Sequence, residues 1–351
     1  MMIDLPAPEH SFASDNAAGA SPEVLEALAA ANIGSALAYG DDRWTRAAID
    51  DVRRTLDAPA EVLFTWGGTG ANVVGLGTLL QPWQAVICAD SAHIVVDECG
   101  APVRFTNSQL IALATPDGKL RPDDLVAPSH WLGSEHHPQP RVVSITQSTE
   151  LGTLYTVDEI AALCDAAHAL DMVVHLDGAR IANAAAALNT DLRAMIRDTG
   201  VDAFTFGFTK NGAVFGEAVC FVDPSLAASA AFVRKQAGQL VSKSRFVAAQ
   251  ISALLADDLW LRNARHANDR AQDLAQRVSA IDGVEVCGTA EVNAVFVRLP
   301  RPVLEVLREW SFFWEWDAGS DLVRWMTSFA TTAEDIDRFV DGIRVALRLP
   351  S

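Results

Sequence analysis

The sequence predicts an α/β fold in which helices cover a mostly parallel sheet, followed by a smaller C-terminal α+β domain. Three observations lead to this prediction. Short apolar runs alternate with helical patterns through the first two thirds of the chain, polar residues follow directly after several of these runs, and the last third becomes rich in alanine and short strands. Such alternation is typical of a parallel sheet, whose chemistry collects at the carboxyl ends of its strands.

Residues typical of helix and strand boundaries mark the first predicted elements of the chain. Ser21-Pro22-Glu23 combines a capping serine, a proline at the first helical position and an early acid, and predicts a helix start. Apolar residues recur at helical spacing over 44–56. A strand over 61–65 then runs into the glycine-rich turn 66–70 and a helix over 71–80. Such a turn leaves backbone N–H groups unpaired and favours anion binding, although a tight turn without a ligand explains it equally well.

The alternation continues to the middle of the chain. Further buried strands are predicted over 85–89, 141–146, 172–176 and 201–206. Thr156-Val157-Asp158-Glu159 is a capping box and opens a helix that runs through His168. Asn211-Gly212 reads as a turn just after the last of these strands.

The last third has a different pattern. It is predicted to hold a helical stretch over 226–280, strands over 284–286 and 294–299, a helix over 302–310, an aromatic run over 312–316, a strand over 322–326 and an amphipathic helix over 336–347. Arg324 interrupts the otherwise apolar last strand. It either reaches solvent or is held toward an anion, because an arginine among aromatic residues is uncommon without a partner.

The chain is long enough for two domains. With 351 residues and 50% hydrophobic content, it exceeds what a single small core usually organises. We expect an N-terminal arm over 1–20, a large domain over 21–250 and a small C-terminal domain over 251–351.

Charge and cysteine usage exclude several classes of protein. A net charge of -18 disfavours nucleic acid and anionic membrane surfaces as partners. The five cysteines show no CxxC or Cys/His spacing, so we expect reduced thiols and no metal site. The chain shows no secretory signal pattern and no apolar stretch of about eighteen residues. A cytoplasmic protein is therefore expected.

Several strand ends place reactive groups at one edge of the predicted sheet. Lys210 follows the strand over 201–206, where partial desolvation lowers the pKa of an ammonium group and favours the neutral amine that attacks carbonyls. Asp177, His93 and Gln147 follow other strands. Singly, each has an ordinary explanation, such as a helix cap or a solvated loop residue. Together with the glycine-rich turn, they combine a lysine, an acid, an imidazole and an anion-binding site.

This combination matches the needs of pyridoxal phosphate. Lys210 would form a Schiff base with the aldehyde, and Asp177 would keep the pyridine nitrogen protonated so that the ring accepts electrons. The glycine-rich turn would bind the phosphate, and an imidazole would stack on the ring. A nicotinamide cofactor is disfavoured, because no ribose-binding acid follows the turn at the expected interval.

Longer motifs make the comparison more specific. They are FASDN at 12–16, AYGDD at 38–42, GTGAN at 68–72, DECGAP at 97–102, TQSTE at 146–150, HLDGAR at 175–180, FGFTKNG at 206–212 and KQAGQ at 235–239. With these motifs the chain resembles the low-specificity L-threonine aldolases, in particular the bacterial branch that also cleaves phenylserine. These enzymes depend on pyridoxal phosphate and have the aspartate aminotransferase-like fold, called fold type I.

The resemblance implies roles for individual residues. Lys210 would bind the cofactor aldehyde, Asp177 the pyridine nitrogen and His93 the ring face. The remaining roles concern the phosphate (Gly68 and Thr69), the substrate carboxylate (Ser14, Arg180 and Arg324), the substrate hydroxyl (His136) and a neighbouring subunit's phosphate (Lys243). Arg180 would also lie near the phenolic oxygen of the cofactor. The same resemblance implies a homotetramer, a dimer of dimers, with shared active sites.

The implied reaction is that of an aldehyde-lyase. It cleaves L-threonine, L-allo-threonine and related β-hydroxy-α-amino acids, including phenylserine, to glycine and an aldehyde. One alternative is a β-eliminating lyase, which would release pyruvate and ammonia, and another is a catalytically silent cofactor-binding or scaffold protein. Retention of Lys210 with its partners argues against the silent protein. Phe208 stands where relatives often have a smaller residue, which leaves the side-chain preference open.

Overall fold

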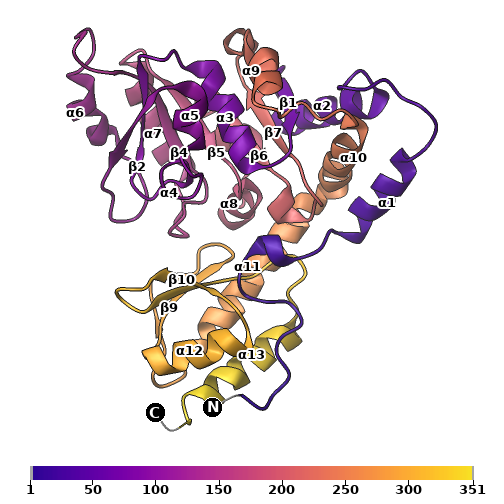
Figure 1. The fold of residues 1–351 in the computed structure, drawn as a ribbon, viewed down its shortest axis with the longest axis vertical. Helices are drawn as coiled ribbons and strands as arrows, with labels where there is room; N and C mark the ends of the chain where they lie inside the picture. The colour runs from indigo at the N-terminus through magenta and orange to yellow at the C-terminus, as the bar shows by residue number, and fades with distance from the viewer. Residues whose placement is uncertain (1–2, 350–351) are drawn as a thin grey trace.

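A computed structural model describes residues 3–349 as a large domain and a small domain joined by one long helix (Figure 1). The large domain contains a seven-stranded sheet with the order β1-β7-β6-β5-β4-β2-β3. The strands are β1 Glu61–Thr65, β2 Gln84–Ala89, β3 Gln109–Leu113, β4 Gln139–Thr146, β5 Val173–Asp177, β6 Ala203–Gly207 and β7 Glu217–Phe221. Only β7 runs against the other six, so the predicted mostly parallel sheet is confirmed.

The large sheet is buried on both faces, which explains its nearly continuous apolar runs. Leu63 and Val219 pack with α3 (Gly68–Leu79) on one face. Phe64 of the same strand as Leu63 packs on the other face, in the cluster that includes α7 (Val157–His168). The sequence pattern did not reveal β3 or β7, because β3 is a half-exposed edge strand and the apolar run of β7 is too short to show a period.

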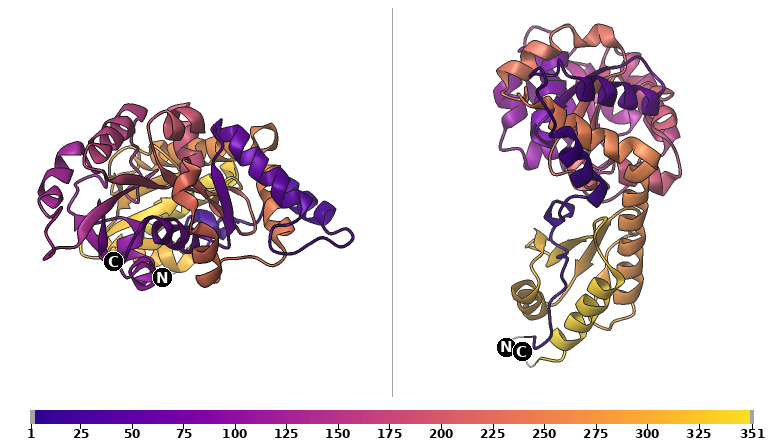
Figure 2. Two further views of the ribbon diagram at one scale, coloured as in Figure 1. Left: turned by 90° about the horizontal axis from the view of Figure 1, so that it is seen from above. Right: turned by 90° about the vertical axis from the view of Figure 1, so that its right-hand side faces the viewer.

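Helices surround the sheet in the views of Figure 2. Besides α3 and α7, the large domain contains α1 Pro22–Ala31, α2 Arg43–Leu56, α4 His93–Val96, α5 Ala101–Thr106, α6 Val126–Ser129, α8 Ile181–Leu188, α9 Ala230–Gln236 and α10 Ser244–Leu255. Most of the sequence-predicted helices recur here with bounds shifted by a few residues. Within residues 3–349, no helix combines the length and the apolar character that crossing a membrane requires.

The small domain has its own antiparallel sheet and its own core. Its strand order is β10-β11-β9-β8, with β8 Glu285–Val286, β9 Ala294–Arg298, β10 Trp314–Asp317 and β11 Leu322–Met326. The helices α12 (Arg301–Trp310) and α13 (Ala333–Ala346) complete this domain. The long helix α11 (Leu259–Val278) packs on α8 of the large domain and on α13 of the small one. The expected α+β character of the last third is thus confirmed.

The N-terminal segment lies along the small domain before it enters the large one (Figure 1). Ile3 and Phe12 are buried in the core of the small domain, where Phe12 contacts Phe339 with ring centroids 4.5 Å apart. The carboxylate of Asp335 accepts hydrogen bonds from the backbone N–H groups of Glu9 and His10. The segment that follows Phe12 therefore reaches the gap between the two domains, which is where the site lies.

Two local predictions can be compared with the structure in detail. The capping box of Thr156 and Glu159 forms both of its hydrogen bonds. Helix α1 begins where the sequence predicts, but the hydroxyl of Ser21 does not cap it. That hydroxyl instead accepts a hydrogen bond from Asn263 Nδ2 at 3.0 Å, because α11 passes beside it. Of the five cysteines, which are all free thiols, Cys88, Cys164 and Cys220 are buried.

Candidate functional site

A pocket opens at the carboxyl edge of the large sheet, as expected for a parallel α/β sheet. Its lining combines residues from strand ends and from the segments that follow them: Gly68, Asn72, His93, Glu98, Thr146, Ser148, Glu150, Asp177, Ala179, Arg180 and Lys210. Lys210, Asp177, His93, Gly68 and Arg180 come together here as the sequence indicated. Asn72, Glu98 and Glu150 had no predicted role.

Lys210 lies in a short helical turn, Thr209–Asn211, directly after β6. The turn can form because residue 207 is glycine: a Cβ there would lie 2.3 Å from the carbonyl oxygen of Ala179. Within residues 3–349, the Lys210 ammonium makes no hydrogen bond or ion pair. Burial and the nearby Arg180 guanidinium lower the pKa of Lys210 below its ordinary value. Lys210 is therefore an available amine rather than a structural cation.

Asp177 ends β5 and is held by hydrogen bonds to both carboxylate oxygens. Asn72 Nδ2 donates to Oδ2 at 2.7 Å, and the backbone N–H of Ala179 donates to Oδ1 at 3.0 Å. Burial raises the pKa of Asp177, but these donors outweigh it and bring the pKa below its ordinary value. The carboxylate therefore stays ionised in the pocket, as a partner for a protonated ring nitrogen must.

A buried chain of hydrogen bonds connects Asp177 to His93. Asn72 Nδ2 also donates to Glu98 Oε1 at 2.8 Å, and the same oxygen lies 2.9 Å from His93 Nδ1. The hydrogen bond to Glu98 raises the pKa of His93, against the opposing effect of burial. Sequence reasoning assigned no role to Asn72 or Glu98. Their presence in GTGAN at 68–72 and DECGAP at 97–102 was the available signal.

The segment after β4 brings a second buried carboxylate to the pocket. Glu150 Oε1 accepts hydrogen bonds from the His93 backbone N–H at 2.8 Å and from Thr146 Oγ1 at 2.9 Å. Burial and the charge of Asp177 raise the pKa of Glu150. Glu150 Oε2 and Ser148 Oγ are buried and have no hydrogen-bond partner among the described residues.

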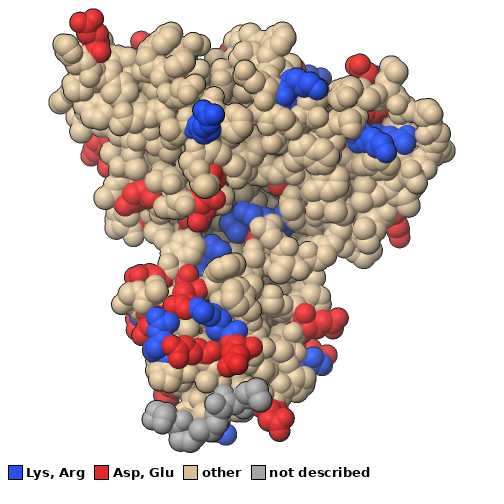
Figure 3. Space-filling model, in the orientation of Figure 1, with Lys and Arg blue, Asp and Glu red and all other residues tan. Residues whose placement is uncertain are grey.

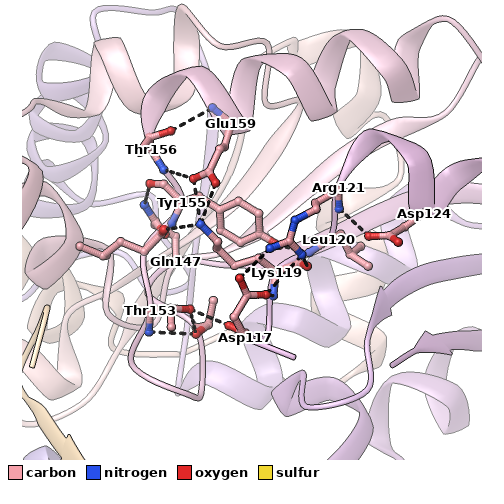
Figure 4. Close-up of polar contacts among 12 residues, drawn as sticks. Asp117, Lys119, Leu120, Arg121, Asp124, Gln147, Thr153, Tyr155, Thr156 and Glu159 are labelled. Carbon is pink, nitrogen blue, oxygen red and sulfur yellow. Dashed lines mark hydrogen bonds and ion pairs between the residues drawn. The ribbon is translucent and has the colours of Figure 1, made fainter. Parts of the chain in front are cut away.

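A separate polar cluster holds this segment in place (Figure 4). The Gln147 side chain bonds the backbone of Tyr155 twice, at 2.8 and 3.0 Å. The Tyr155 hydroxyl accepts a hydrogen bond from the Leu120 N–H at 2.6 Å. Lys119 Nζ donates to the Leu154 carbonyl at 3.0 Å and to Glu159 Oε1 at 2.8 Å. The sequence placed Gln147 at the sheet edge. In the structure it holds the segment after β4 through Tyr155 and does not line the pocket.

Arg180 is fixed by a bidentate ion pair with Asp15. Its Nε and Nη2 donate to the two carboxylate oxygens of Asp15 at 2.7 and 3.0 Å. Asn293 Nδ2 adds a hydrogen bond to Asp15 at 3.1 Å. Burial raises the pKa of Asp15, but the Arg180 charge and these hydrogen bonds outweigh it and lower the pKa to about 2. Ser14, the adjacent residue, brings its hydroxyl within 3.4 Å of Asp15.

Arg324 reaches the gap between the domains from β11. Its guanidinium lies over the ring of Trp316, 4.6 Å from the centroid, and its buried Nε has no hydrogen-bond partner among residues 3–349. Burial and the charge of Arg180 lower the pKa of Arg324 to about 10. Figure 3 shows basic side chains gathered in the hollow between the domains, although the molecule as a whole is acidic. The alternative in which Arg324 is held toward an anion agrees with this arrangement.

The glycine-rich turn forms the N-terminus of α3 beside the pocket. The backbone of Gly67 and Gly68 has open space around it, so an anion can approach closely. Gly70 is different, because a Cβ there would lie 2.2 Å from the side-chain oxygen of Gln239. Thr69 is half-buried next to Gly68. Unpaired N–H groups at a helix N-terminus and an adjacent hydroxyl suit a phosphate.

Five of the site residues that the resemblance implied are absent from the pocket lining. Ser14, Thr69 and Arg324 lie beside the pocket, whereas His136 and Lys243 lie away from it within one chain. His136 is exposed and precedes β4, at the edge of the sheet opposite the site. The length of β4, at about 3.3 Å per residue, separates the two edges. Lys243 is exposed at the start of α10, which packs on α1 and α2. Neither residue lines the pocket.

The pocket fits pyridoxal phosphate. One space is surrounded by an amine that has no partner within residues 3–349, an ionised carboxylate, a half-exposed imidazole and an open helix N-terminus. The buried Ser148 Oγ, which has no partner in the described part of the chain, adds an unused hydrogen-bonding group. The fold and the site therefore define a pyridoxal-phosphate-dependent enzyme of fold type I.

Comparison with known proteins identifies the family within this class. A model described as β-eliminating lyase matches residues 11–301, and the chain belongs to this family. The chain is 42% identical over 339 residues to the low specificity L-threonine aldolase of Pseudomonas aeruginosa, covering 96% of this chain and 97% of that protein. The resemblance found in the motifs is thereby confirmed.

Solved structures agree with this assignment. The threonine aldolase of Leishmania major superposes with a TM-score of 0.89 at 30% identity and covers 96% of this chain and 99% of that chain. A serine palmitoyltransferase structure from Sphingomonas wittichii, with a TM-score of 0.74 and 15% identity, covers 97% of this chain and 88% of its own. The second comparison supports the fold alone.

Proposed function

We propose that this chain cleaves the Cα–Cβ bond of L-threonine, L-allo-threonine and related β-hydroxy-α-amino acids, including phenylserine, to glycine and an aldehyde. The observation that carries the proposal is the amine of Lys210, which has no partner among the described residues, beside the ionised carboxylate of Asp177. The guanidinium of Arg180 lines the same pocket. The family to which the chain belongs, and its 42% identity to an L-threonine aldolase, support the same reaction.

The cofactor would be held by groups that already face the pocket. Lys210 would bind its aldehyde, Asp177 its ring nitrogen and His93 one face of its ring. The N-terminus of α3, with Gly68 and Thr69, would bind its phosphate. When bound, pyridoxal phosphate supplies an electron sink for the carbanion that bond cleavage leaves at Cα.

Ser14, Arg180 and Arg324 would hold the substrate carboxylate. Asp15 fixes the direction of the Arg180 guanidinium, while Arg324 keeps an Nε that is unpaired within residues 3–349 and can donate to an anion. A carboxylate clamped in this way fixes the rotation about the bond between the substrate's amino nitrogen and Cα. Only a bond perpendicular to the cofactor ring releases its electrons into the ring, so the clamp selects Cα–Cβ cleavage.

His136 would accept the proton of the β-hydroxyl, directly or through a water, while His93 chiefly stacks on the ring. Because His136 lies at the opposite edge of its own sheet, this role requires a neighbouring chain. The same holds for Lys243 as a phosphate contact. We therefore propose a homotetramer, a dimer of dimers with shared active sites. The cytoplasmic location expected from the sequence is also part of the proposal.

A product assay tests the reaction. The purified protein with pyridoxal phosphate is given L-threonine, L-allo-threonine and L-phenylserine in turn. We expect glycine with acetaldehyde or benzaldehyde. Pyruvate and ammonia from a β-substituted amino acid, without glycine from any of the three substrates, would instead indicate a β-eliminating lyase. Absence of any product from all of these compounds would contradict an enzymatic function.

A further inference from the structure

A second cavity lies between the two domains, next to the pocket of Lys210. Its volume is about 560 Å³, and it is lined by Ser91, Val96, Asp97, Leu151, Trp314, Glu315, Trp316 and Arg324. Cavities of roughly 300–1,000 Å³ are typical of small-molecule sites. A smaller cavity joins the two spaces. It shares Arg324 with the interdomain cavity, and it shares Ser148, Glu150 and Arg180 with the pocket of Lys210.

The walls of this interdomain cavity combine apolar side chains, two of them indole rings, with an equal number of polar and charged ones. Trp314 and Trp316 of β10 both line the cavity, although a β-bulge interrupts the strand between Glu315 and Asp317. Trp314 is 55% exposed although its ring also contacts Phe312. Leu151 and Val96 add aliphatic surface from the large domain. Exposed indole surface inside a cavity is the kind of surface that an aromatic ligand covers.

The charges of the cavity favour some ligands over others. Arg324 is the proposed carboxylate contact. Glu315 is neutralised by ion pairs with Arg301, at 2.8 Å, and with Arg308. Asp97 has no side-chain partner within the described part of the chain. Once a substrate carboxylate neutralises Arg324, a second anionic group would meet the charge of Asp97.

We propose that the interdomain cavity binds the β-substituent of the substrate and selects a large apolar group, an aryl ring above all, over a methyl group and over a carboxylate. The argument rests on the proposed function. With the carboxylate held between Arg180 and Arg324, which both line the joining cavity, Cα lies where that cavity meets the pocket of Lys210. The interdomain cavity is then the adjoining space that takes a large β-substituent, on the side of Trp314. Trp314 and Leu151 are then specificity-determining residues, whereas Trp316 acts by positioning the guanidinium that lies over it.

Trp314→Ala tests the subsite directly. We expect the ratio of kcat/KM for L-phenylserine to that for L-threonine to fall by about tenfold or more, since loss of apolar contact in a pocket changes discrimination by about 10- to 200-fold. Leu151→Phe should lower the same ratio by filling the cavity. The unaltered protein should also cleave β-hydroxyaspartate, which carries an anionic substituent, less efficiently than L-phenylserine.

Two controls separate specificity from general damage. Trp83, which is 63% exposed just before β2 at the opposite edge of the sheet, is the matched control, and Trp83→Ala should leave both substrates unaffected. Trp316→Ala should lower kcat/KM for both substrates, because Arg324 loses the ring beneath it. An unchanged ratio in Trp314→Ala would overturn the proposal.

A binding measurement gives a readout that is independent of turnover. Benzyl alcohol carries the aryl group without a reactive aldehyde, and calorimetric titration into the holoenzyme should show saturable binding that Trp314→Ala weakens. Equal binding by both proteins would overturn the subsite. Absence of cleavage of every substrate by the unaltered protein would instead overturn the proposed function, so the two failures are distinguishable.

Discussion

Lys210 is the residue on which the proposed chemistry depends most directly. Lys210→Ala should abolish both the visible absorbance of the lysine-bound cofactor and turnover, because no other amine lines the pocket among the described residues. Absorbance spectra and the product assay measure these effects. Borohydride reduction followed by peptide mapping should label Lys210. Label on Lys243 or Lys235 would show that the cofactor is bound elsewhere.

Asp177 provides a second prediction at the same scale. Asp177→Asn keeps an oxygen that can accept the Ala179 N–H bond, and its new NH2 group can donate to the Asn72 side-chain oxygen once that amide turns over. The variant should therefore fold and still bind cofactor. It should lose most activity, because a neutral amide cannot keep the ring nitrogen protonated. Steady-state kinetics with L-threonine, beside a cofactor-binding titration, provide the measurement. Activity within a few fold of the unaltered protein would rule out this role.

Glu98 acts on His93 in a manner that depends on pH. Because the Glu98 hydrogen bond raises the folded-state pKa of His93, it stabilises the fold below the unfolded pKa of about 6.5, and this stabilisation is lost as pH rises through the folded pKa. Glu98→Gln should therefore lower the His93 pKa in an NMR titration. The free energy of unfolding of the Glu98→Gln variant should lie furthest below that of the unaltered protein at pH below about 6.5. A loss that grows with rising pH would contradict this coupling.

At the scale of elements, the segment after β4 depends on Tyr155. Tyr155→Phe removes the buried acceptor of the Leu120 N–H and should cost about 1–3 kcal/mol in urea unfolding. The chain offers one matched control, since its only other tyrosine, Tyr39, is 53% exposed. Tyr39→Phe should leave stability unchanged. Equal effects of the two substitutions would show that the Tyr155 hydroxyl does not hold the segment.

At the scale of the whole molecule, one chain does not bring all the expected residues together. His136→Ala should depress L-threonine cleavage by roughly 10²- to 10⁴-fold while affecting exchange of the glycine α-proton much less, because exchange does not involve the hydroxyl. His137→Ala, which removes a ring stacked on Trp131, is the neighbouring control. Mixing and reassembling His136→Ala with Lys210→Ala subunits should restore some cleavage. Failure to restore it, in tetramers shown to be mixed, would contradict a site shared between chains.

Much of the fold could be predicted from sequence because its causes are local. β1 was placed with its observed bounds, since an apolar run bounded by turn signals is typical of a strand buried on both faces. The sequence also predicted the capping box of Thr156, which the structure confirms. Edge strand β3 and antiparallel β7 were not predicted, because their pairing depends on distant neighbours. Phe208, whose effect on side-chain preference was left open, is fully buried against Phe206, with ring centroids 4.2 Å apart, and does not line the pocket.

The sequence by itself determined the class of chemistry, because a lysine, an acid and a glycine-rich turn after strands must meet at one edge of a parallel sheet. Only the tertiary structure decided which groups touch. Glu98 and Asn72 join His93 to Asp177 across three separate segments, and Asp15 fixes Arg180 from 165 residues away. The interdomain cavity likewise exists only once the domains are packed. Hydrogen bonds and cavities of this kind arise between segments far apart in the chain, which no local pattern encodes.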